Sequence, residues 1–377
     1  MTRKLGEMGT FIKGAPLSKA DISDEGTPFI LYGELYTTYS EVTNSVKRKT
    51  DKTVEHQFYS KIGDVIMPTS GETPEDIATA SCIMIPDVIL AGDLLIYRTE
   101  QIDGRFVSFC VKNKVNKQIS SVAQGKSVVH VRAEELSKIS VTFPALDEQQ
   151  KILSLLESID RRIATQQKLI ETLKKYKRGL HKLVFIKNRK PSWEKSALHD
   201  IASFCGGGTP SKDVSSYWDG EIGWISSSDI QEEWIDDISV TRRITKKAID
   251  NSATKLCPEG TIAIVSRVGV GKVAIIPESL CTSQDFTNIT SITGNTHYMA
   301  YQIAFRMKLE AMKTQGTSIK GVTADTIKSM GVDIPPLEEQ KKIADMLTAF
   351  DSYIKRAVYE LDIFLTMKKA LLQQLFI

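Results

Sequence analysis

The chain has 377 residues, of which 41% are hydrophobic and 25% are charged, and its formal net charge is +3. This composition excludes a disordered or fibrous chain, and the length favours two domains over one. We find no run of about 18 uncharged apolar residues and no signal-peptide pattern, so we expect a cytoplasmic protein without a membrane span. The small net charge alone does not indicate a nucleic-acid partner.

The five cysteines are scattered, without a close pair in the sequence and without a neighbouring histidine at zinc-ligand spacing. We therefore predict neither a disulfide framework nor a metal site. Isolated cysteines are most often small buried apolar residues, so none of the five is assigned any chemistry.

The first part of the chain contains short segments rich in Ile, Val, Tyr and Phe and separated by Gly, Asp and Pro. These strand-like segments are residues 28–36, 63–68, 91–98 and 106–111. Frequent turns between short strands favour a mainly β or an α+β module.

A long helix is predicted from Glu148 to Ile186. Pro144 cannot lie inside a helix, whereas Asp147 and Glu148 favour a first helical turn. About 39 residues would span roughly 58 Å. Apolar residues recur every seven positions, each with a partner four positions further on, and they are Ile152, Ile159, Leu173 and Leu180 with Leu156, Ile163, Ile170 and Val184. This heptad is typical of a coiled-coil seam.

The same segment is strongly basic. From Arg161 to Lys190 it contains eleven lysines or arginines and a single acid, Glu171. Two interpretations remain open, namely a solvated helix face and contact with phosphates.

A second module follows, with strand-like segments at 222–230, 260–267 and 272–278. It holds all four tryptophans, Trp193, Trp218, Trp224 and Trp234, which are compatible with base stacking but more often form a core.

The chain contains an internal repeat. Residues 335–343 (PPLEEQKKI) repeat residues 144–152 (PALDEQQKI) at an offset of 191, and the offset holds without a gap for about sixty residues. The second helix keeps the heptad, with Ile343, Phe350, Ala357, Phe364 and Leu371 beside Leu347, Ile354, Leu361 and Leu375. Because an isolated amphipathic helix leaves its apolar stripe in water, we predict that the two helices pack as an antiparallel coiled coil. The alternative is that each helix folds back on its own module.

Loops of both modules carry hydroxyls, lysines, arginines and glutamines, which hold phosphates and base edges. The candidate DNA-binding residues of the first half are Ser18, Lys19, Tyr32, Thr69, Ser70, Arg98 and Lys126. Those of the second half are Thr209, Ser211, Lys212, Ser226, Ser227, Ser228, Arg267, Lys272, Ser283, Gln284 and Lys320. A loop of Gly, Ser and Thr is usually only a turn, so the prediction depends on the set.

Catalytic motifs are absent from the sequence. We find no P-loop, no HExxH, no GxSxG and no Asn-Pro-Pro-aromatic loop, and GVG at 269–271 is only a fragment of a dinucleotide fingerprint. We therefore predict a non-catalytic chain that binds no metal and no cofactor.

Two divergent modules, each closed by P-x-L-x-E-Q-x-K-I and a heptad helix that ends in Leu-x-x-x-x-Phe-Ile, resemble the specificity subunit of type I restriction-modification systems. The Gln-Gly-x-Ser turns at 124 and 315, the Gly-Gly-Thr-Pro-Ser loop before Lys212 and the Ser-Arg-x-Gly turn at 266 agree with this resemblance. The resemblance covers essentially the whole chain, and its helix motif is the most specific part.

The resemblance implies an α+β protein in which residues 1–143 and 191–333 are target recognition domains, each reading half of an asymmetric bipartite DNA site. Residues 144–190 and 334–377 would be conserved helical regions that form the antiparallel coiled coil, related by a pseudo-twofold repeat. The helix pair would set the spacer between half-sites that lie about 34 to 36 Å apart, near one DNA turn.

The implied partners are double-stranded DNA and two modification subunits, which bind S-adenosylmethionine and methylate adenine. Restriction subunits that use ATP and Mg²⁺ would join where the system has them. The main alternative is a coiled-coil scaffold without DNA readout. A self-contained methyltransferase or nuclease is less favoured, because its motifs are missing.

One departure from the repeat lies at the N-terminus. The segment PSWEK, residues 191–195, precedes the second module, whereas the first module has only Met1–Lys4 in its place. This leaves open how the first module begins.

Overall fold

The computed structural model describes residues 1–123, 129–314 and 321–376 of the chain, which divides into two compact units. Unit 1 consists of Met1–Gln167 and Glu360–Ile377, and unit 2 consists of Lys168–Tyr359. The candidate residues Lys126 and Lys320 and the Gln-Gly-x-Ser turns lie outside the described residues. The domain boundaries expected from the sequence stay predictions.

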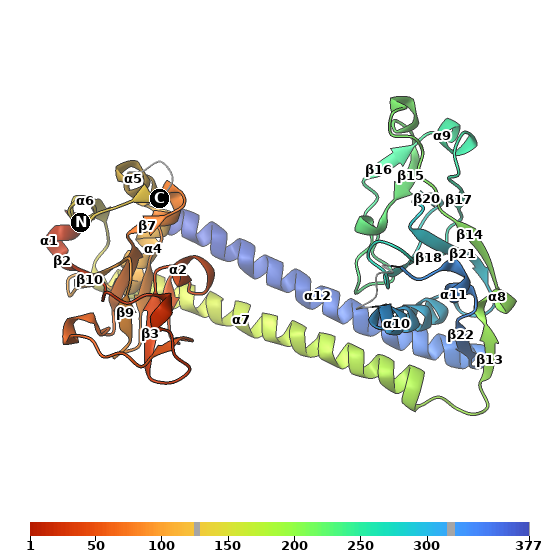
Figure 1. Cartoon of the computed structure of the whole chain (residues 1–377), viewed down its shortest axis with the longest axis horizontal. Helices are drawn as coiled ribbons and strands as arrows, with labels where there is room; N and C mark the ends of the chain where they lie inside the picture. Colours follow the sequence, from red (N-terminus) through yellow and green to blue (C-terminus); the bar gives the residue numbers. More distant parts are fainter. Residues whose placement is uncertain (124–128, 315–320, 377) are drawn as a thin grey trace. The chain divides into compact units, whose positions relative to one another are not determined.

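Unit 1 combines short strands with short helices (Figure 1). Its strands are β1 (Thr2–Lys4), β2 (Gly9–Lys13), β3 (Thr27–Leu31), β4 (Val42–Thr43), β5 (Lys49–Thr50), β6 (Asp64–Pro68), β7 (Ser70–Gly71), β8 (Ser81–Ile83), β9 (Ile89–Ala91), β10 (Leu94–Thr99), β11 (Val129–His130) and β12 (Ser140–Thr142). Its short helices are α1 (Leu5–Met8), α2 (Glu34–Thr37), α3 (Pro74–Ile77), α4 (Gly104–Asn113), α5 (Asn116–Val122) and α6 (Ala133–Ser137), with 3-10 turns η1 (Lys19–Asp21) and η2 (His56–Phe58).

Unit 2 has the same kinds of elements. Its strands are β13 (Glu194–Ala197), β14 (Ala202–Gly206), β15 (Ile222–Ile225), β16 (Arg242–Ile244), β17 (Leu256–Cys257), β18 (Ile262–Val265), β19 (Val273–Ile275), β20 (Leu280–Thr282), β21 (Phe286–Ile292) and β22 (Gly331–Ile334). Its helices are α8 (Leu198–Ile201), α9 (Lys246–Asp250), α10 (Thr296–Thr314) and α11 (Ala324–Lys328), with 3-10 turns η4 (Ser215–Tyr217) and η5 (Ser227–Asp229).

The two modules share one topology. The sheet order β2-β10-β6-β8 in unit 1 matches β14-β21-β18-β19 in unit 2. In each module a central strand, β3 or β15, pairs in parallel with β9 or β20 and antiparallel with β5 or β16. The duplication therefore extends into the regions where sequence identity is lost, and the predicted α+β fold is confirmed.

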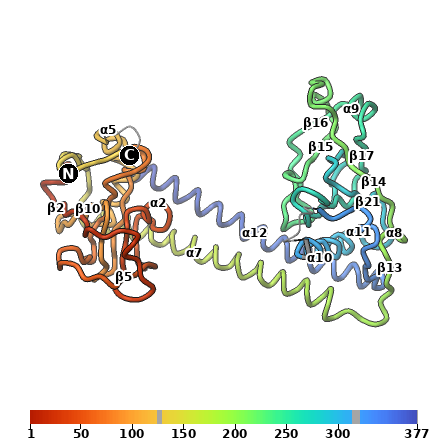
Figure 2. The backbone as a smooth tube through the Cα atoms, viewed as in Figure 1, coloured from red at the N-terminus to blue at the C-terminus, as the bar shows by residue number. Residues whose placement is uncertain are grey.

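The two modules also begin in the same way. Strand β1 pairs antiparallel with β12, as β13 pairs with β22 in unit 2. Met1–Lys4 thus takes the structural place of the segment that opens the second module. Both chain ends lie in unit 1, as Figure 2 marks.

The strand predictions were wrong in part: residues 34–36 lie in α2, residues 227–229 lie in η5, and residues 106–111 form no strand. Residues 106–111 lie in α4, a helix that begins after Asp103, whose carboxylate accepts a hydrogen bond from the Arg105 amide at 2.9 Å. Phe106 to Val111 are all buried, and a short apolar run of this kind does not distinguish a buried helix from a strand. The N-cap aspartate decides the structure locally.

The two long helices occur where the repeat predicted them. Helix α7 (Leu146–Lys182) continues into a π-helical turn, η3 (Leu183–Lys187), and α12 spans Leu337–Leu375. None of the predicted seam residues is exposed. Asp147 and Glu148 lie in the first turn of α7, and His181 and Lys182 lie in its last turn, as the helix dipole favours.

The helices pack antiparallel, as predicted. Within unit 1, Lys368 pairs with Asp160 at 2.7 Å and the Gln166 side-chain amide donates to the Glu360 carboxylate at 3.2 Å. Positions therefore rise along α7 as they fall along α12. Within unit 2, Lys177 pairs with Asp351 at 2.6 Å. Lys177 and Asp160 occupy the same places in the repeat as Lys368 and Asp351, so the two ion pairs are repeat-related.

The glutamine of the repeated Glu-Gln motif attaches each helix start to its module. The Gln149 amide donates to the Pro144 carbonyl at 2.9 Å, and its oxygen accepts from the Asp103 amide at 3.0 Å. Gln340 makes the same two bonds with Pro335 and Asn295 at 2.8 Å each. Both glutamines are buried, and buried polar groups need hydrogen-bond partners. These bonds explain why glutamine recurs in the motif, since it holds the start of each helix on its module.

The end of each long helix completes the core of a module. Phe376 is 2% exposed and its ring lies 5.2 Å from Phe106 and 5.9 Å from Phe109 in unit 1. Its repeat mate Phe185 lies 5.6 Å from Phe305 in unit 2. Each helix thus starts on one module and ends in the core of the other. This arrangement excludes the alternative in which each helix folds back on its own module.

His181 departs from the apolar repeat, since Leu372 occupies the matching position. Its ring lies 5.9 Å from the rings of Phe185 and Tyr301, and burial, together with Lys177 and Lys308, lowers its pKa to about 3. In the unfolded chain this histidine binds a proton below about pH 6.5, whereas the folded protein does not bind one until about pH 3. Its contribution to stability is therefore complete above pH 6.5 and is lost as the pH falls.

We expect His181→Leu to remove this pH dependence. Between pH 7.5 and pH 5 the wild type should lose about 2 kcal/mol of unfolding free energy more than the variant does. Urea unfolding of both proteins at the two pH values measures the difference. Equal losses in both proteins would contradict a neutral His181 in the core.

Candidate nucleic-acid interface

In unit 2 the candidate residues meet at one edge of a sheet. Strands β15 and β20 are parallel, so the loops that follow them leave from the same edge. The Ser283 amide donates to the Ile225 carbonyl at 2.9 Å, which joins the two loops. The Gly208 amide donates to the Thr282 carbonyl at 2.8 Å. The glycine-rich loop therefore reaches the same edge from a distant part of the chain.

The glycines of this loop are required by close packing. A Cβ atom on Gly207 would lie 1.9 Å from the Ser283 carbonyl oxygen, and one on Gly208 would lie 2.5 Å from the backbone of residues 253–254. The loop then presents the Thr209 hydroxyl, which hydrogen-bonds to the Gln284 side chain. Only glycine lets the backbone approach closely enough to place these two polar side chains together.

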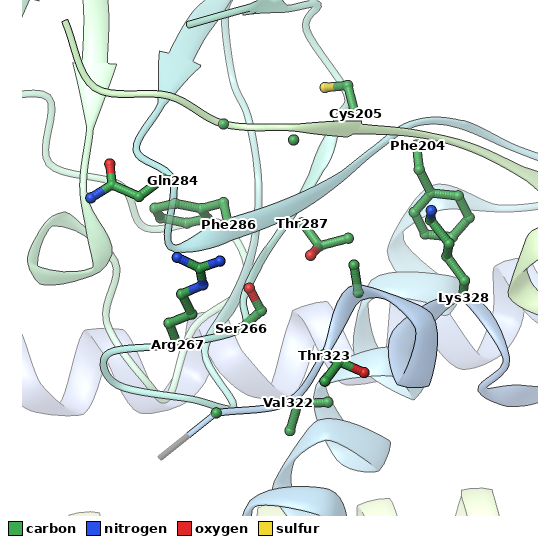
Figure 3. A pocket seen from close by; sticks show the side chains of 14 residues that line it. Phe204, Cys205, Ser266, Arg267, Gln284, Phe286, Thr287, Val322, Thr323 and Lys328 are labelled. Carbon is green, nitrogen blue, oxygen red and sulfur yellow. The ribbon is translucent and has the colours of Figure 1, made fainter. Parts of the chain in front are cut away.

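A pocket of about 560 Å³ lies beside this edge (Figure 3). Arg267 and Gln284 lie on one side of it, and Lys328 and Phe204 lie on the other. Arg267 and Gln284 are exposed, so the Arg267 guanidinium and the Gln284 side-chain NH2 group are accessible to a ligand, while the Gln284 side-chain oxygen accepts from Thr209. The residues that line the pocket are Phe204, Cys205, Gly206, Gly207, Ser266, Arg267, Gln284, Phe286, Thr287, Gly321, Val322, Thr323, Ala324 and Lys328.

The serine loop after β15 is held from two sides. The Ser226 amide donates to the Asp229 carboxylate at 2.7 Å, and the Lys272 ammonium donates to the Ser227 carbonyl at 2.9 Å. Ser228 is exposed beyond these contacts. Lys272, predicted as a DNA contact, lies at the interface but donates within the fold.

The remaining candidates of unit 2 differ in exposure. Ser211 and Lys212 are exposed, and the Ser211 carbonyl accepts a hydrogen bond from the Trp218 indole at 3.0 Å. Ser283 is 2% exposed, and its hydroxyl donates a hydrogen bond to the Asp285 carboxylate, so it supports the loop from the buried side.

Unit 1 builds the corresponding edge. Tyr32 follows β3, and Gly92 follows its parallel neighbour β9. A Cβ atom on Gly92 would lie 3.5 Å from the Leu17 carbonyl and 3.8 Å from the Tyr32 ring, which places the loop of Ser18 and Lys19 nearby.

Thr69 and Ser70 reach this edge through Asp93. The Thr69 amide donates to the Asp93 carbonyl at 2.8 Å, and the Ser70 hydroxyl donates to its carboxylate at 3.3 Å. In unit 2 the Ser266 amide donates to the Asp285 carbonyl at 2.8 Å in the same way. Of the unit 1 candidates that the structure describes, all but Arg98 therefore lie near this edge, as the described candidates of unit 2 do.

Arg98 is placed differently. Its guanidinium pairs with the buried Asp64 at 3.0 Å and donates to the Tyr59 carbonyl at 2.7 Å. Only 17% of its side chain is exposed, so these internal contacts account for most of its donors. Asp64 lies 34 residues before Arg98, and nothing in the sequence pattern indicates the pairing.

The other open features of the sequence have structural explanations. In the basic segment, Lys174, Lys177, Arg189 and Lys190 pair with acids of unit 2, while most of the others are exposed. Trp193, Trp224 and Trp234 are buried, and the Trp218 ring packs edge-on against Trp224 at 5.2 Å, which indicates a core.

The sequence did not reveal the pair of charges that lies beside the candidate edge of each module. These are Glu34 with Arg48 in unit 1 and Asp229 with Arg242 in unit 2. The partners lie more than ten residues apart on loops that differ in length, so the offset of 191 does not align them. The only signal of these pairs in the sequence was a basic residue next to a strand-like segment, close to a loop of candidate DNA-binding residues.

The model of the type I restriction modification DNA specificity domain matches residues 1–175 and 191–360 of the chain. The chain belongs to this family. The two matched segments of this chain correspond to the two halves of the repeat. The family is defined by DNA specificity and not by catalysis, which agrees with the prediction of a non-catalytic specificity subunit.

Curated relatives agree with this assignment. The MjaIX specificity subunit of Methanocaldococcus jannaschii is 34% identical over 167 residues, which are 43% of this chain and 39% of the relative. The EcoR124I/EcoR124II specificity subunit of Escherichia coli is 29% identical over 232 residues, 57% of this chain and 56% of the relative. The matched stretches thus span about half of these relatives or less.

A solved structure shows the same fold across the whole chain. The S subunit of a type I restriction-modification system from M. genitalium superposes with a TM-score of 0.62 at 14% identity, covering 100% of this chain and 96% of that one. Among the residues of this chain that the structure describes, no three His, Cys, Asp or Glu side chains are grouped to hold a metal ion. In the same part of the chain, no helix has the length and apolar character of a membrane span.

Proposed function

We propose that this chain recognises an asymmetric bipartite sequence in double-stranded DNA, with one half-site read by each module. The observation that carries the proposal is the repeated edge, at which a parallel strand pair and a nearby loop present polar side chains. Tyr32 lies at this edge in unit 1, whereas Ser226 and Gln284 lie at it in unit 2. One scaffold with different side chains is suited to reading two different half-sites.

We propose that the chain acts within a larger enzyme. Its partners would be two modification subunits, which bind S-adenosylmethionine and methylate adenine. Restriction subunits that use ATP and Mg²⁺ would join where the system has them. Membership of a DNA specificity family supports this role, as do relatives named as specificity subunits of type I restriction enzymes. The chain would provide recognition, and its partners would provide catalysis and the cofactors.

DNA binding and its salt dependence test the proposal against the scaffold alternative. We expect the complex of this chain with its modification subunits to bind specific duplex DNA. The affinity should fall by about a thousandfold or more between 50 and 200 mM salt, because each phosphate contact releases counterions. A complex built on a scaffold without DNA readout would bind this duplex no more tightly than one with changed half-sites, because its modification subunits alone would contact the DNA.

Arg267 provides the sharpest residue test. We expect Arg267→Ala to weaken binding of the specific site by about 1–3 kcal/mol and to relax the half-site read by the second module. Lys341→Ala removes an exposed cation near the start of α12, outside this edge, and serves as the matched control. Competition binding with single-base variants of the site measures both effects. Equal results for the two variants would remove Arg267 from the interface.

A further inference from the structure

A buried acid follows the central strand of each module. Glu34 comes after β3 and is 3% exposed, and Asp229 comes after β15 and is 8% exposed. The Glu34 carboxylate accepts a hydrogen bond from the Leu31 amide at 3.1 Å. The Asp229 carboxylate accepts one from the Ser226 amide at 2.7 Å. Each acid therefore closes the turn that leaves the central strand.

An arginine from the neighbouring antiparallel strand pairs with each acid. The Arg48 Nε atom lies 3.3 Å from the Glu34 carboxylate, and Arg48 directly precedes β5. Arg242, the first residue of β16, pairs with Asp229 and donates to the Ser226 hydroxyl at 2.7 Å. Each pair thus joins the turn after the central strand to the strand beside it.

In unit 2 the arginine is also fixed by an aromatic ring. The Arg242 guanidinium carbon lies 4.6 Å from the centre of the Trp224 ring, and Trp224 is directly opposite Arg242 in the strand register. The guanidinium is therefore held by a ring, a carboxylate and a hydroxyl. Such a side chain has little freedom to move, so the turn that it holds is also fixed.

Burying the carboxylate of Glu34 or Asp229 costs desolvation energy, which an apolar side chain of similar size would avoid, while each arginine keeps more than a third of its side chain exposed. Core stability alone is therefore a weak reason for an ion pair at this place. The pair nevertheless occurs in both modules, with Glu in one and Asp in the other, although the surrounding loops differ. What the two sites share is their position, directly beside residues 32–33 in unit 1 and 226–228 in unit 2.

We propose that Glu34–Arg48 and Asp229–Arg242 are positioning pairs, each of which holds the DNA-reading loop of its own module in place. The inference rests on the proposed function, since it concerns how the same edges read DNA. Hydrogen bonds to base edges depend on the placement of the donors and acceptors to within a fraction of an ångström. Loss of one pair should therefore loosen base selection in one half-site and leave the other half-site unchanged.

The test uses the full-length chain with its modification subunits in a host that lacks other adenine methylation. Glu34→Gln and Asp229→Asn keep the shape of each acid and remove its charge. Sequencing of methylated adenines gives the recognised motif and its variants. We expect each substitution to reduce the discrimination against single-base changes by about tenfold. This factor lies within the usual effect of one mismatched base pair on affinity. Glu34→Gln should relax one half-site and Asp229→Asn the other.

Controls separate positioning from a general loss of structure. Arg243 is the exposed neighbour of Arg242, and the Arg243 guanidinium donates to the Glu221 carbonyl at 2.6 Å. Arg243→Gln should therefore leave the recognised motif unchanged. Arg242→Gln should relax the same half-site as Asp229→Asn, and the double variant should add little to either. Thermal unfolding identifies any variant that has lost its fold. Arg48→Lys then replaces a misfolded Glu34 variant, and Arg242→Lys replaces a misfolded variant of the other pair, because lysine keeps the charge but not the geometry of the guanidinium.

The possible outcomes are distinct. Relaxation confined to opposite half-sites by the two acid variants supports the proposal. An unchanged motif in both folded variants, or relaxation of the same half-site by both, overturns it while leaving the proposed function intact. Absence of any methylation motif with the wild-type chain would instead refute the proposed function.

Discussion

Phe376→Ala is expected to destabilise unit 1 by about 3–5 kcal/mol. The Phe376 ring is buried against Phe106 and Phe109, and Phe376 directly follows Leu375, the last residue of α12. Its removal leaves a cavity between α4 and the end of α12 that neighbouring side chains cannot fill completely. Urea unfolding of the wild type and the variant measures the loss.

Phe364, which lies within α12, offers a control of the same residue type. It is only half-buried, and the Arg162 guanidinium carbon lies 6.0 Å from the centre of its ring. Phe364→Ala should therefore cost clearly less than Phe376→Ala. A Phe376 variant as stable as the wild type would show that the end of α12 does not complete the core of the first module.

Insertion of one helical turn into both long helices is expected to lengthen the spacer between the half-sites. Four residues add about 6 Å to each helix, close to the rise of two base pairs, so we expect one or two additional base pairs. The insertions belong between residues 167 and 168 and between residues 359 and 360, where the chain passes from one unit to the other. Sequencing of methylated adenines reports the spacer directly.

Insertion into a single helix is the control. It shifts one apolar seam against the other, so Lys177 could no longer face Asp351 while Lys368 faces Asp160, and loss of modification is expected. Neither insertion changes the residues of the candidate DNA-binding edges, so each module should recognise the same bases as in the wild type. A double insertion that modifies DNA with the original spacer would refute the role of the helices in spacing.

The helical part of the fold could be predicted because its signals are local and repeated. Pro144, the acids that follow it and the heptad of apolar residues define a helix without knowledge of the rest of the chain. The same pattern at an offset of 191 predicts the second helix and the pairing of the two. The reason for the motif could not be predicted, because the bonds of Gln149 and Gln340 reach residues more than forty positions away.

The modules were less predictable, because tertiary contacts decide their local structure. Residues 106–111 resemble a strand in composition and form a helix because Asp103 caps it and both faces are buried. Arg98 looked like a DNA contact because its partner Asp64 is distant in the sequence. Neither the meeting of the candidate loops at one edge nor the acid–arginine pairs beside them could be predicted, because both depend on contacts between residues that are distant in the sequence.

The proposed function requires that this chain selects the DNA sequence at which other subunits act. The most direct measurement maps methylated adenines across the genome of a host that carries the modification subunits, with and without this chain. We predict that one two-part motif with an unspecified spacer is methylated only when the chain is present. An identical methylation map in its absence would contradict the claim.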